Sequence, residues 1–114
     1  MKDWDAVVAY ARTLPGVELG TSYGCAALKV RGKTIAGTTA PDPASFVLHT
    51  TADEKPVLME TDPDTFWQTP HYDGWPVVLA RYGTDADERI RLLIARAWWD
   101  RATKAQRTAY GERP

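Results

Sequence analysis

The segment from Phe66 to Arg81 holds the side chains of this chain that are best suited to chemistry. It contains four aromatic residues, two prolines and His71, which is one of only two histidines. Beside Tyr72 and Asp73, this imidazole could act as a general acid or base, or could recognise a small anionic ligand. Catalysis also needs a partner within hydrogen-bonding distance, and the sequence identifies none. The favoured interpretation is a turn in which the imidazole bonds a backbone carbonyl.

The same segment defines a candidate ligand-binding turn. Its members could surround a small molecule or a group on a protein partner, and they are Thr69, His71, Tyr72, Trp75 and Arg81. An enzyme would require a cleft that brings His71, Tyr72 and Asp73 together beside Arg81. Tryptophans in small sheet proteins more often serve in packing, so the rings alone do not establish a site.

Motifs for metals, cofactors and nucleophilic catalysis are missing from the sequence. His49 and His71 are the only histidines, and neither belongs to a ligand spacing. Cys25, the single cysteine, has apolar neighbours that favour a packed thiol. The chain contains no P-loop, GxGxxG, GxSxG or HExxH pattern. We therefore expect no metal, no cofactor and no enzymatic activity.

The charge of the chain is small in sum but uneven along its length. The net charge of −1 argues against a general nucleic-acid binder, which normally carries a large positive excess. Residues 1–88 carry seven basic and thirteen acidic side chains, whereas residues 89–114 carry seven basic and two acidic ones. The sequence thus combines an acidic body with a basic C-terminal segment.

Two groups of cations could contact phosphates. The first lies at the tip of a predicted hairpin and comprises Lys29, Arg31 and Lys33. The second comprises Arg89, Arg96 and Arg107, which fall within about 20° of one another if the last helix is regular and continuous. A solvated arginine face is the commoner meaning of such a stripe.

The elements that must position these residues follow from periodicity and from turn signals. Asp3 can cap a first helix that ends before Pro15-Gly16, and residues 20–24 are predicted to form a turn. Extended runs are predicted at 27–30, 34–38 and 45–49. A second helix, capped by Thr51 or Asp53, is predicted to reach about residue 60.

The remaining elements complete one domain over residues 1–114. Two further strands are predicted at 65–68 and 75–82, followed by a helix that a capping box of Asp85 and Glu88 would start. That helix reaches at least Ala102 and either continues to Gly111 or breaks near Thr103. The order αβββαββα predicts an α+β two-layer sandwich, an antiparallel sheet with its helices on one face.

Several sequence pieces carry a resemblance to a known family. They are Leu14-Pro15-Gly16-Val17-Glu18, Ser22-Tyr23-Gly24, Leu28-Lys29-Val30, Asp62-Pro63-Asp64-Thr65-Phe66, Thr69-Pro70-His71-Tyr72-Asp73-Gly74-Trp75-Pro76 and Ala97-Trp98. In this order they resemble the MmcQ/YjbR family of small bacterial proteins with a two-layer α/β fold. The resemblance implies a DNA-binding role by analogy, with no established catalytic residues to carry over. Cys25-Ala26 departs from the family pattern, which has a polar residue followed by proline there.

These observations predict a non-enzymatic DNA-binding protein. The hairpin tip and the last helix would contact phosphates, with an affinity that is weak and falls with salt. The alternative is a module that binds a small molecule or a protein through the turn from His71 to Trp75. The single cysteine and the absence of an export signal predict a cytoplasmic location, and no apolar run is long enough to cross a membrane.

Overall fold

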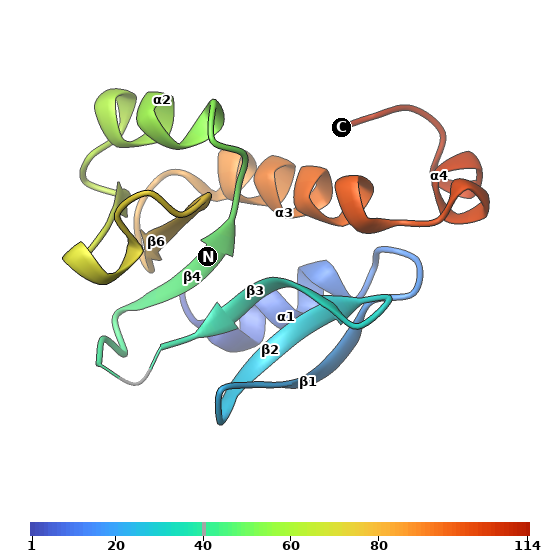
Figure 1. Ribbon diagram of the computed structural model, residues 1–114, viewed down its shortest axis with the longest axis horizontal. Coiled ribbons are helices and arrows are strands. Elements are labelled where there is room, and N and C mark those ends of the chain that lie inside the picture. The colour runs from blue at the N-terminus through green and yellow to red at the C-terminus, as the bar shows by residue number, and fades with distance from the viewer. Residues whose placement is uncertain (40) are drawn as a thin grey trace.

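Six strands pair in one antiparallel sheet with the order β1-β2-β3-β4-β6-β5 (Figure 1). The computed structural model describes residues 1–39 and 41–114. The strands are β1 (Glu18–Ser22), β2 (Cys25–Val30), β3 (Lys33–Thr38), β4 (Ser45–His49), β5 (Phe66–Trp67) and β6 (Val77–Arg81). The helices are α1 (Trp4–Ala11), α2 (Glu54–Thr61), α3 (Asp87–Arg101) and α4 (Lys104–Tyr110), with a 3₁₀ turn, η1 (Pro70–Tyr72). The predicted α+β class is confirmed.

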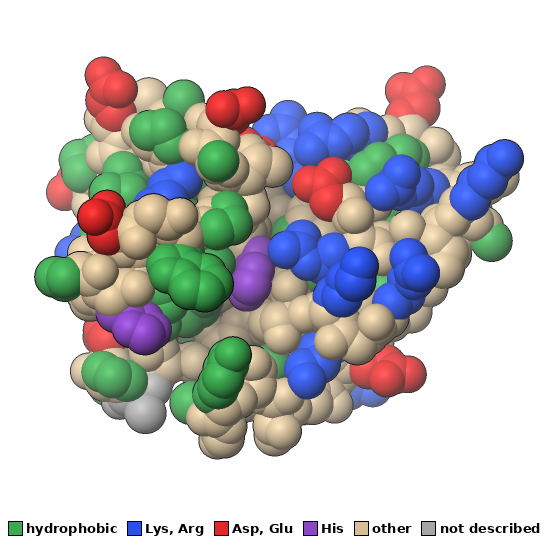
Figure 2. Space-filling model, in the orientation of Figure 1, with side chains coloured by type: hydrophobic (Ala, Val, Ile, Leu, Met, Phe, Trp, Pro, Cys, Tyr) green, Lys and Arg blue, Asp and Glu red, His purple; other side chains and the backbone are tan. Residues whose placement is uncertain are grey.

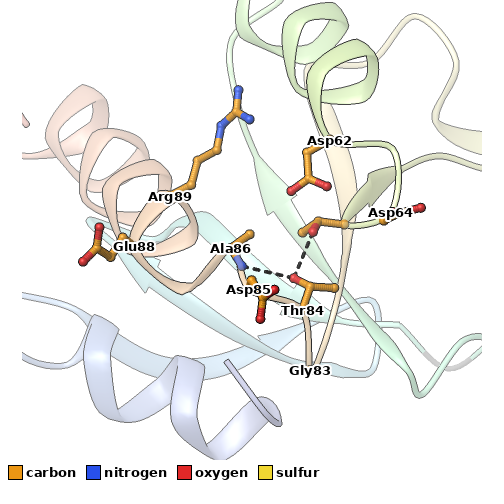
Figure 3. A pocket seen from close by; sticks show the side chains of 9 residues that line it. Asp62, Asp64, Gly83, Thr84, Asp85, Ala86, Glu88 and Arg89 are labelled. Carbon is orange, nitrogen blue, oxygen red and sulfur yellow. Dashed lines mark hydrogen bonds between the residues drawn. The ribbon is translucent and has the colours of Figure 1, made fainter.

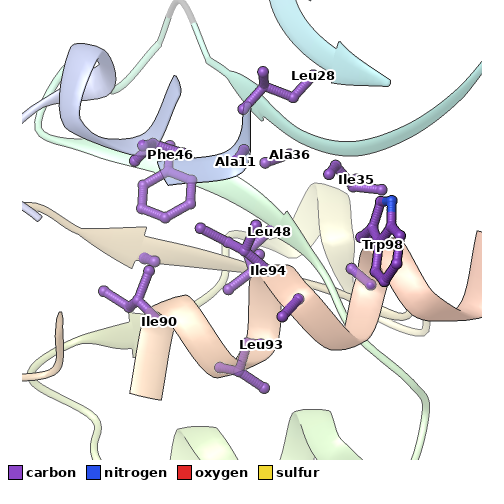
Figure 4. Packing of buried hydrophobic residues seen from close by; sticks show 14 of the residues in the cluster. Ala11, Leu28, Ile35, Ala36, Phe46, Leu48, Ile90, Leu93, Ile94 and Trp98 are labelled. Carbon is purple, nitrogen blue, oxygen red and sulfur yellow. The ribbon is translucent and has the colours of Figure 1, made fainter. Parts of the chain in front are cut away.

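One face of the sheet carries the hydrophobic core. Leu28, Ala36, Leu48 and Val78 lie in register across four strands, and all of them are buried. Side chains of α1, α2 and α3 join the same cluster, and α3 supplies the stripe that was predicted to face the core (Figure 4): Ile90, Leu93, Ile94, Ala97 and Trp98. The helices therefore gather on one face, as expected.

Successive side chains of a strand point to opposite faces of the sheet, so the residues that alternate with these core residues lie on the opposite face. We call this the open face. Lys29, Val47 and His49 lie on it, and α1 lies behind β2 and β3 in Figure 1. Because β2 and β4 are each antiparallel to β3, the last residues of both strands lie at the same end of the sheet. His49 pairs with Val77, so β6 begins at this end too. We call it the hairpin end, after the β2–β3 turn at Arg31-Gly32.

A strand that the sequence did not predict forms one edge of the sheet. Residues 20–24 were predicted to form a turn, but Glu18–Ser22 is extended and pairs along its length with β2. The turn is confined to Tyr23 and Gly24, whose φ angles are 51° and 78°. The strand is polar, contains Gly20 and is mostly exposed, so it lacks the apolar alternation from which strands are predicted.

The helix boundaries confirm some predicted caps and correct others. Asp3 caps α1, with its Oδ1 accepting from the Ala6 N–H at 2.9 Å. Thr51, rather than Asp53, caps α2. The Thr51 hydroxyl accepts a hydrogen bond from the Glu54 N–H, and the Glu54 carboxylate accepts one from the Thr51 N–H. The predicted capping box of Asp85 and Glu88 is wrong. The α3 N-cap is Ala86, which has no side chain that could accept a bond.

The last predicted helix is two helices. Ala102 leaves the helical conformation with a ψ of 157°, and Thr103 is also extended. Thr103 and Gln106 then form a capping box that starts α4, with backbone-to-side-chain distances of 3.0 and 2.8 Å. Of the two forms predicted for this segment, the structure has the one that breaks near Thr103.

None of the helices in the described residues is both long enough and apolar enough to cross a lipid bilayer.

Candidate nucleic-acid interface

The tip of the β2–β3 hairpin carries the first group of predicted cations. Arg31 and Gly32 form the two-residue turn with φ angles of 54° and 75°, the conformation that lets short hairpins match the twist of their strands. A non-glycine residue with positive φ costs about 1 kcal/mol. Arg31 and Lys33 are exposed, and Lys29 is half-buried on the open face. The hairpin thus presents three cations at one tip.

Helix α4 brings further cations to this hairpin. A Cβ atom added to Gly16 would lie 2.3 Å from Gln106 Nε2 and 3.9 Å from Val30 Cγ2, so α4 and the end of β2 both pack on Gly16. Arg107 is held in place, because its Nε donates to the Trp99 carbonyl at 2.8 Å and its guanidinium lies 5.4 Å from the Trp99 ring centroid.

The cations of the hairpin and of the C-terminal helices gather on one side of the molecule. Figure 2 shows Lys and Arg side chains clustered over the β2–β3 hairpin and the region of α3 and α4, with a few Asp and Glu side chains among and beside them. The side of α2 carries more Asp and Glu than Lys and Arg in this view. We call this region the basic face and define it by the cations that the β2–β3 hairpin, the end of α3 and α4 carry, which are Lys29, Arg31, Lys33, Arg101, Lys104 and Arg107.

The predicted arginine stripe does not exist as a continuous feature. The break after Ala102 places Arg107 on a different helix. Arg89 lies at the opposite end of α3, with its guanidinium 5.7 Å from the Phe66 ring centroid. Arg96 is half-buried, lies 3.6 Å from Glu54 and donates to the Pro114 carbonyl. Arg89 and Arg96 are therefore engaged within the protein, in contrast to Arg31 and Lys33.

Arg89 also borders a shallow depression beside the start of α3 (Figure 3). Asp62, Asp64, Asp85 and Glu88 line it, which gives it several carboxylates and one guanidinium. The Thr84 hydroxyl at its base is satisfied, because it bonds the Thr65 hydroxyl at 2.9 Å and accepts from the Ala86 N–H at 3.4 Å. Within residues 1–39 and 41–114, no cluster of His, Cys, Asp or Glu has an arrangement that could hold a metal ion.

Arg101 and His49, which the sequence did not single out, lie together at the hairpin end of the sheet. Arg101 Nη2 is 3.5 Å from His49 Nδ1, and Arg101 Nη1 donates to the Ala97 carbonyl at 3.0 Å. Burial, with a smaller contribution from the guanidinium, lowers the pKa of His49 to about 4. The imidazole is neutral near pH 7. Because a guanidinium can only donate, Nδ1 faces it as an acceptor and Nε2 carries the proton.

The aromatic turn is held from beneath by a buried lysine. Lys55 Nζ donates to the carbonyls of Tyr72 and Trp75 at 2.7 and 2.8 Å. The turn closes further through the Trp75 N–H, which donates to the Tyr72 carbonyl at 3.0 Å, while Thr69 is the N-cap of η1. His71 is exposed and meets the edge of the Tyr72 ring, with the two ring centroids 4.8 Å apart. The segment is a turn, as predicted. The predicted bond from the His71 imidazole to a backbone carbonyl is not found in the described residues, where the imidazole meets the Tyr72 ring instead.

Arg81 does not belong to this turn. It lies at the other end of β6, with its guanidinium 4.7 Å from the Trp67 ring centroid. Its Nη1 donates to the carbonyls of Pro63 and Asp64, so it fixes the connection that leads into β5. The predicted grouping of Arg81 with His71 is wrong, because Arg81 is the last residue of the five-residue strand β6, whose other end adjoins the turn.

The comparison with protein-family models identifies the chain. The model of the family named YjbR matches residues 12–99. The chain belongs to the YjbR family. Searches of the curated proteins and of the solved structures found no match.

Membership of the YjbR family covers most of the site but not all of it. The matched residues of this YjbR chain include the β2–β3 hairpin, the Lys55-supported turn and most of α3. Arg101 and the whole of α4 lie beyond residue 99. The cations of the basic face thus come both from the matched region and from the segment that follows it.

Sequence reasoning missed three residues of this YjbR site, and each had a weak signal. His49 ends an apolar strand, where a polar residue usually marks only the transition to a loop. Lys55 lies in the first turn of α2, where lysine is ordinarily solvated. Arg101 follows Trp98 and Trp99 at the end of α3. Its weak signal was its position two residues before Thr103, where a break of the helix was one of the two forms predicted.

Proposed function

We propose that this YjbR-family protein binds DNA through its basic face, by contacts to phosphates and without enzymatic activity. The observation that carries the proposal is the convergence of cations from two distant parts of the chain on one side of the molecule (Figure 2). A protein whose cations are concentrated on one side can attract a polyanion even when its net charge is close to zero.

The energetics of such an interface are electrostatic. Each phosphate neutralised by a lysine or arginine releases condensed counterions, so the logarithm of the binding constant falls with the logarithm of the salt concentration by about 0.9 per contact on duplex DNA. A face with six cations makes at most six such contacts. We therefore expect modest affinity and a strong dependence on salt.

The aromatic turn supports the part of the proposal that assigns no enzymatic activity. His71 contacts only the Tyr72 ring among the interactions found for its side chain, and Asp73 bonds Gln68 at 3.4 Å. No base and nucleophile face each other there in the described residues. A cytoplasmic location, where DNA is accessible, is part of the same proposal.

Titration of labelled DNA by fluorescence anisotropy tests the proposal. At about 50 mM salt we expect binding that weakens by orders of magnitude at about 200 mM. Arg31→Ala and Lys33→Ala should each weaken binding severalfold and reduce the salt slope by about 1. The matched control is Arg91→Ala, since Arg91 is exposed on α3 but borders Met1 and Tyr10 on the side of α1. Absence of binding at low salt, or equal effects of all three variants, would refute the proposal.

The second candidate function is a module that binds a small molecule or a protein partner at the aromatic turn. The observation that favours it is the support of the turn by Lys55, which fixes a mostly exposed Trp75 in one position. A ligand of the turn would raise the melting temperature, and His71→Ala would remove that increase while Arg31→Ala would not.

A further inference from the structure

Trp75 is an exposed aromatic ring on a rigid support. Its exposed fraction is 64 %, whereas the four other tryptophans are half-buried or buried. The carbonyl of Trp75 accepts from Lys55, and its N–H donates to Tyr72. The next carbonyl, that of Pro76, accepts from the Thr50 N–H at 2.8 Å. The backbone on both sides of the ring is thus tied to α2 and to the end of β4.

The topology of the sheet places this ring at the same end as the basic face. Trp75 lies two residues before Val77, which pairs with His49, and Arg101 lies against that histidine. The Arg31 turn lies at the same end, on the far side of β3. From β6 to β2 there are three strand spacings, which amount to about 14 Å. A short stretch of a polymer can span this distance.

An exposed, fixed ring at the same end of a sheet as several cations is an arrangement that can bind unpaired bases. A base stacks on an aromatic side chain whatever its identity, and neighbouring phosphates contact lysines and arginines. In a duplex the base faces are already stacked on each other, so the ring could reach one only after the duplex was locally opened. The cations can contact the phosphates of either form of nucleic acid, but the ring can stack only on an unpaired base and therefore favours the single strand.

We propose that Trp75 stacks an unpaired base while Arg101 and the hairpin cations hold the adjacent phosphates, so that the protein prefers single-stranded nucleic acid to duplex. This inference rests on the proposed function, since it names the form of the polymer that the basic face takes. The hairpin end of the sheet is then the binding surface, with the aromatic turn at one side and Arg31 at the other.

The test compares labelled oligothymidine, oligouridine and a DNA duplex of equal length at low salt. We expect a single strand to bind about tenfold more tightly than the duplex, or better. Trp75→Ala should remove about tenfold in single-strand affinity and little in duplex affinity. Trp75→Phe should retain most of the preference, because it keeps a stacking ring. The tighter of the two single strands identifies DNA or RNA as the ligand.

Tyr23→Ala is the matched control, because Tyr23 is fully exposed but lies at the opposite end of β2 from Arg31. It should leave both affinities unchanged. A second readout is intrinsic fluorescence, which single strands should quench in the unaltered protein and far less in the Trp75→Phe variant.

The two proposals can fail separately. Duplex binding equal to or tighter than single-strand binding, or single-strand affinity unchanged by Trp75→Ala, overturns the preference. If Arg31→Ala still weakens binding in that case, the proposed function stands. Failure of all three nucleic acids to bind at low salt overturns both proposals. Thermal melting of each variant establishes that it is folded before its affinity is compared.

Discussion

Arg101 reaches the end of β4, where its Nη2 lies 3.5 Å from Nδ1 of His49. The contact joins the last turn of α3 to the sheet at the point where the sheet meets the aromatic turn. It also keeps a cation at the hairpin end while the histidine beside it stays neutral.

The burial of His49, with a smaller contribution from this contact, predicts a pH dependence of stability that His49 controls. Its pKa is about 4 in the folded protein and about 6.5 in the unfolded chain. As the pH falls below 6.5, the unfolded chain therefore takes up a proton that the folded protein does not. The folded state loses up to about 3 kcal/mol between pH 6.5 and pH 4, and nothing further from this group below that range.

Urea unfolding at a series of pH values measures the effect. His49→Gln keeps an acceptor for Arg101 but does not titrate, so its free energy of unfolding should change less between pH 6.5 and pH 4 than that of the unaltered protein. Carboxylates contribute equally to both proteins and cancel in the difference. Parallel pH profiles for the two proteins would show that His49 does not carry the dependence.

Lys55 is predicted to fix the aromatic turn through its two backbone contacts. Lys55→Met keeps the aliphatic stem but leaves the carbonyls of Tyr72 and Trp75 without their donor. We expect a loss of about 1–3 kcal/mol in the free energy of unfolding and faster amide hydrogen exchange over residues 69–76. Lys104→Met, at an exposed lysine, should change neither quantity by more than about 0.5 kcal/mol. An unaltered exchange rate in the turn of Lys55→Met would contradict the assignment.

Gly16 is predicted to hold α4 against the hairpin. In Gly16→Ala the new methyl group would meet Gln106, whose side chain completes the α4 capping box. Gly24→Ala is the control, because Gly24 has a similar positive φ of 78° against 73° but has nothing within 4 Å of the added Cβ. Both variants suffer the backbone cost of about 1 kcal/mol.

Hydrogen exchange separates the two glycine variants. Gly16→Ala alone should also speed amide exchange in α4, because displacement of Gln106 removes part of the helix cap. If the two variants show the same exchange in α4, the contact between Gly16 and Gln106 does not anchor the helix.

Much of the fold could be predicted because its core residues repeat with regular periods. The stripe from Ile90 to Trp98 and the apolar run from Phe46 to Leu48 both indicated their elements correctly. The edge strand Glu18–Ser22 could not be found this way, because its stability comes from pairing with β2 and not from its own apolar side chains. The start of α3 was misjudged because the pattern of Asp85 and Glu88 resembles a capping box.

The site was less predictable than the fold, because it depends on contacts between residues far apart in sequence. The turn at Arg31 and Gly32 could be predicted from local sequence, and with it the position of the cations at the hairpin tip. The structure has the turn at this place. The assumption of one continuous final helix aligned Arg89, Arg96 and Arg107, and the break at Ala102 removed that alignment. No local pattern announces that Lys55 meets a turn some twenty residues away.

The most direct test of the account uses two pairs of charge reversals with the same net charge. Arg31→Glu with Lys104→Glu alters the hairpin and α4, the two sources of the basic face, whereas Lys2→Glu with Arg91→Glu alters exposed cations beside α1. Binding of labelled nucleic acid is measured for both at about 50 mM salt. We predict that the first pair abolishes binding and that the second leaves it within about threefold of the unaltered protein. Equal losses in the two pairs would show that only total charge matters and would contradict the account.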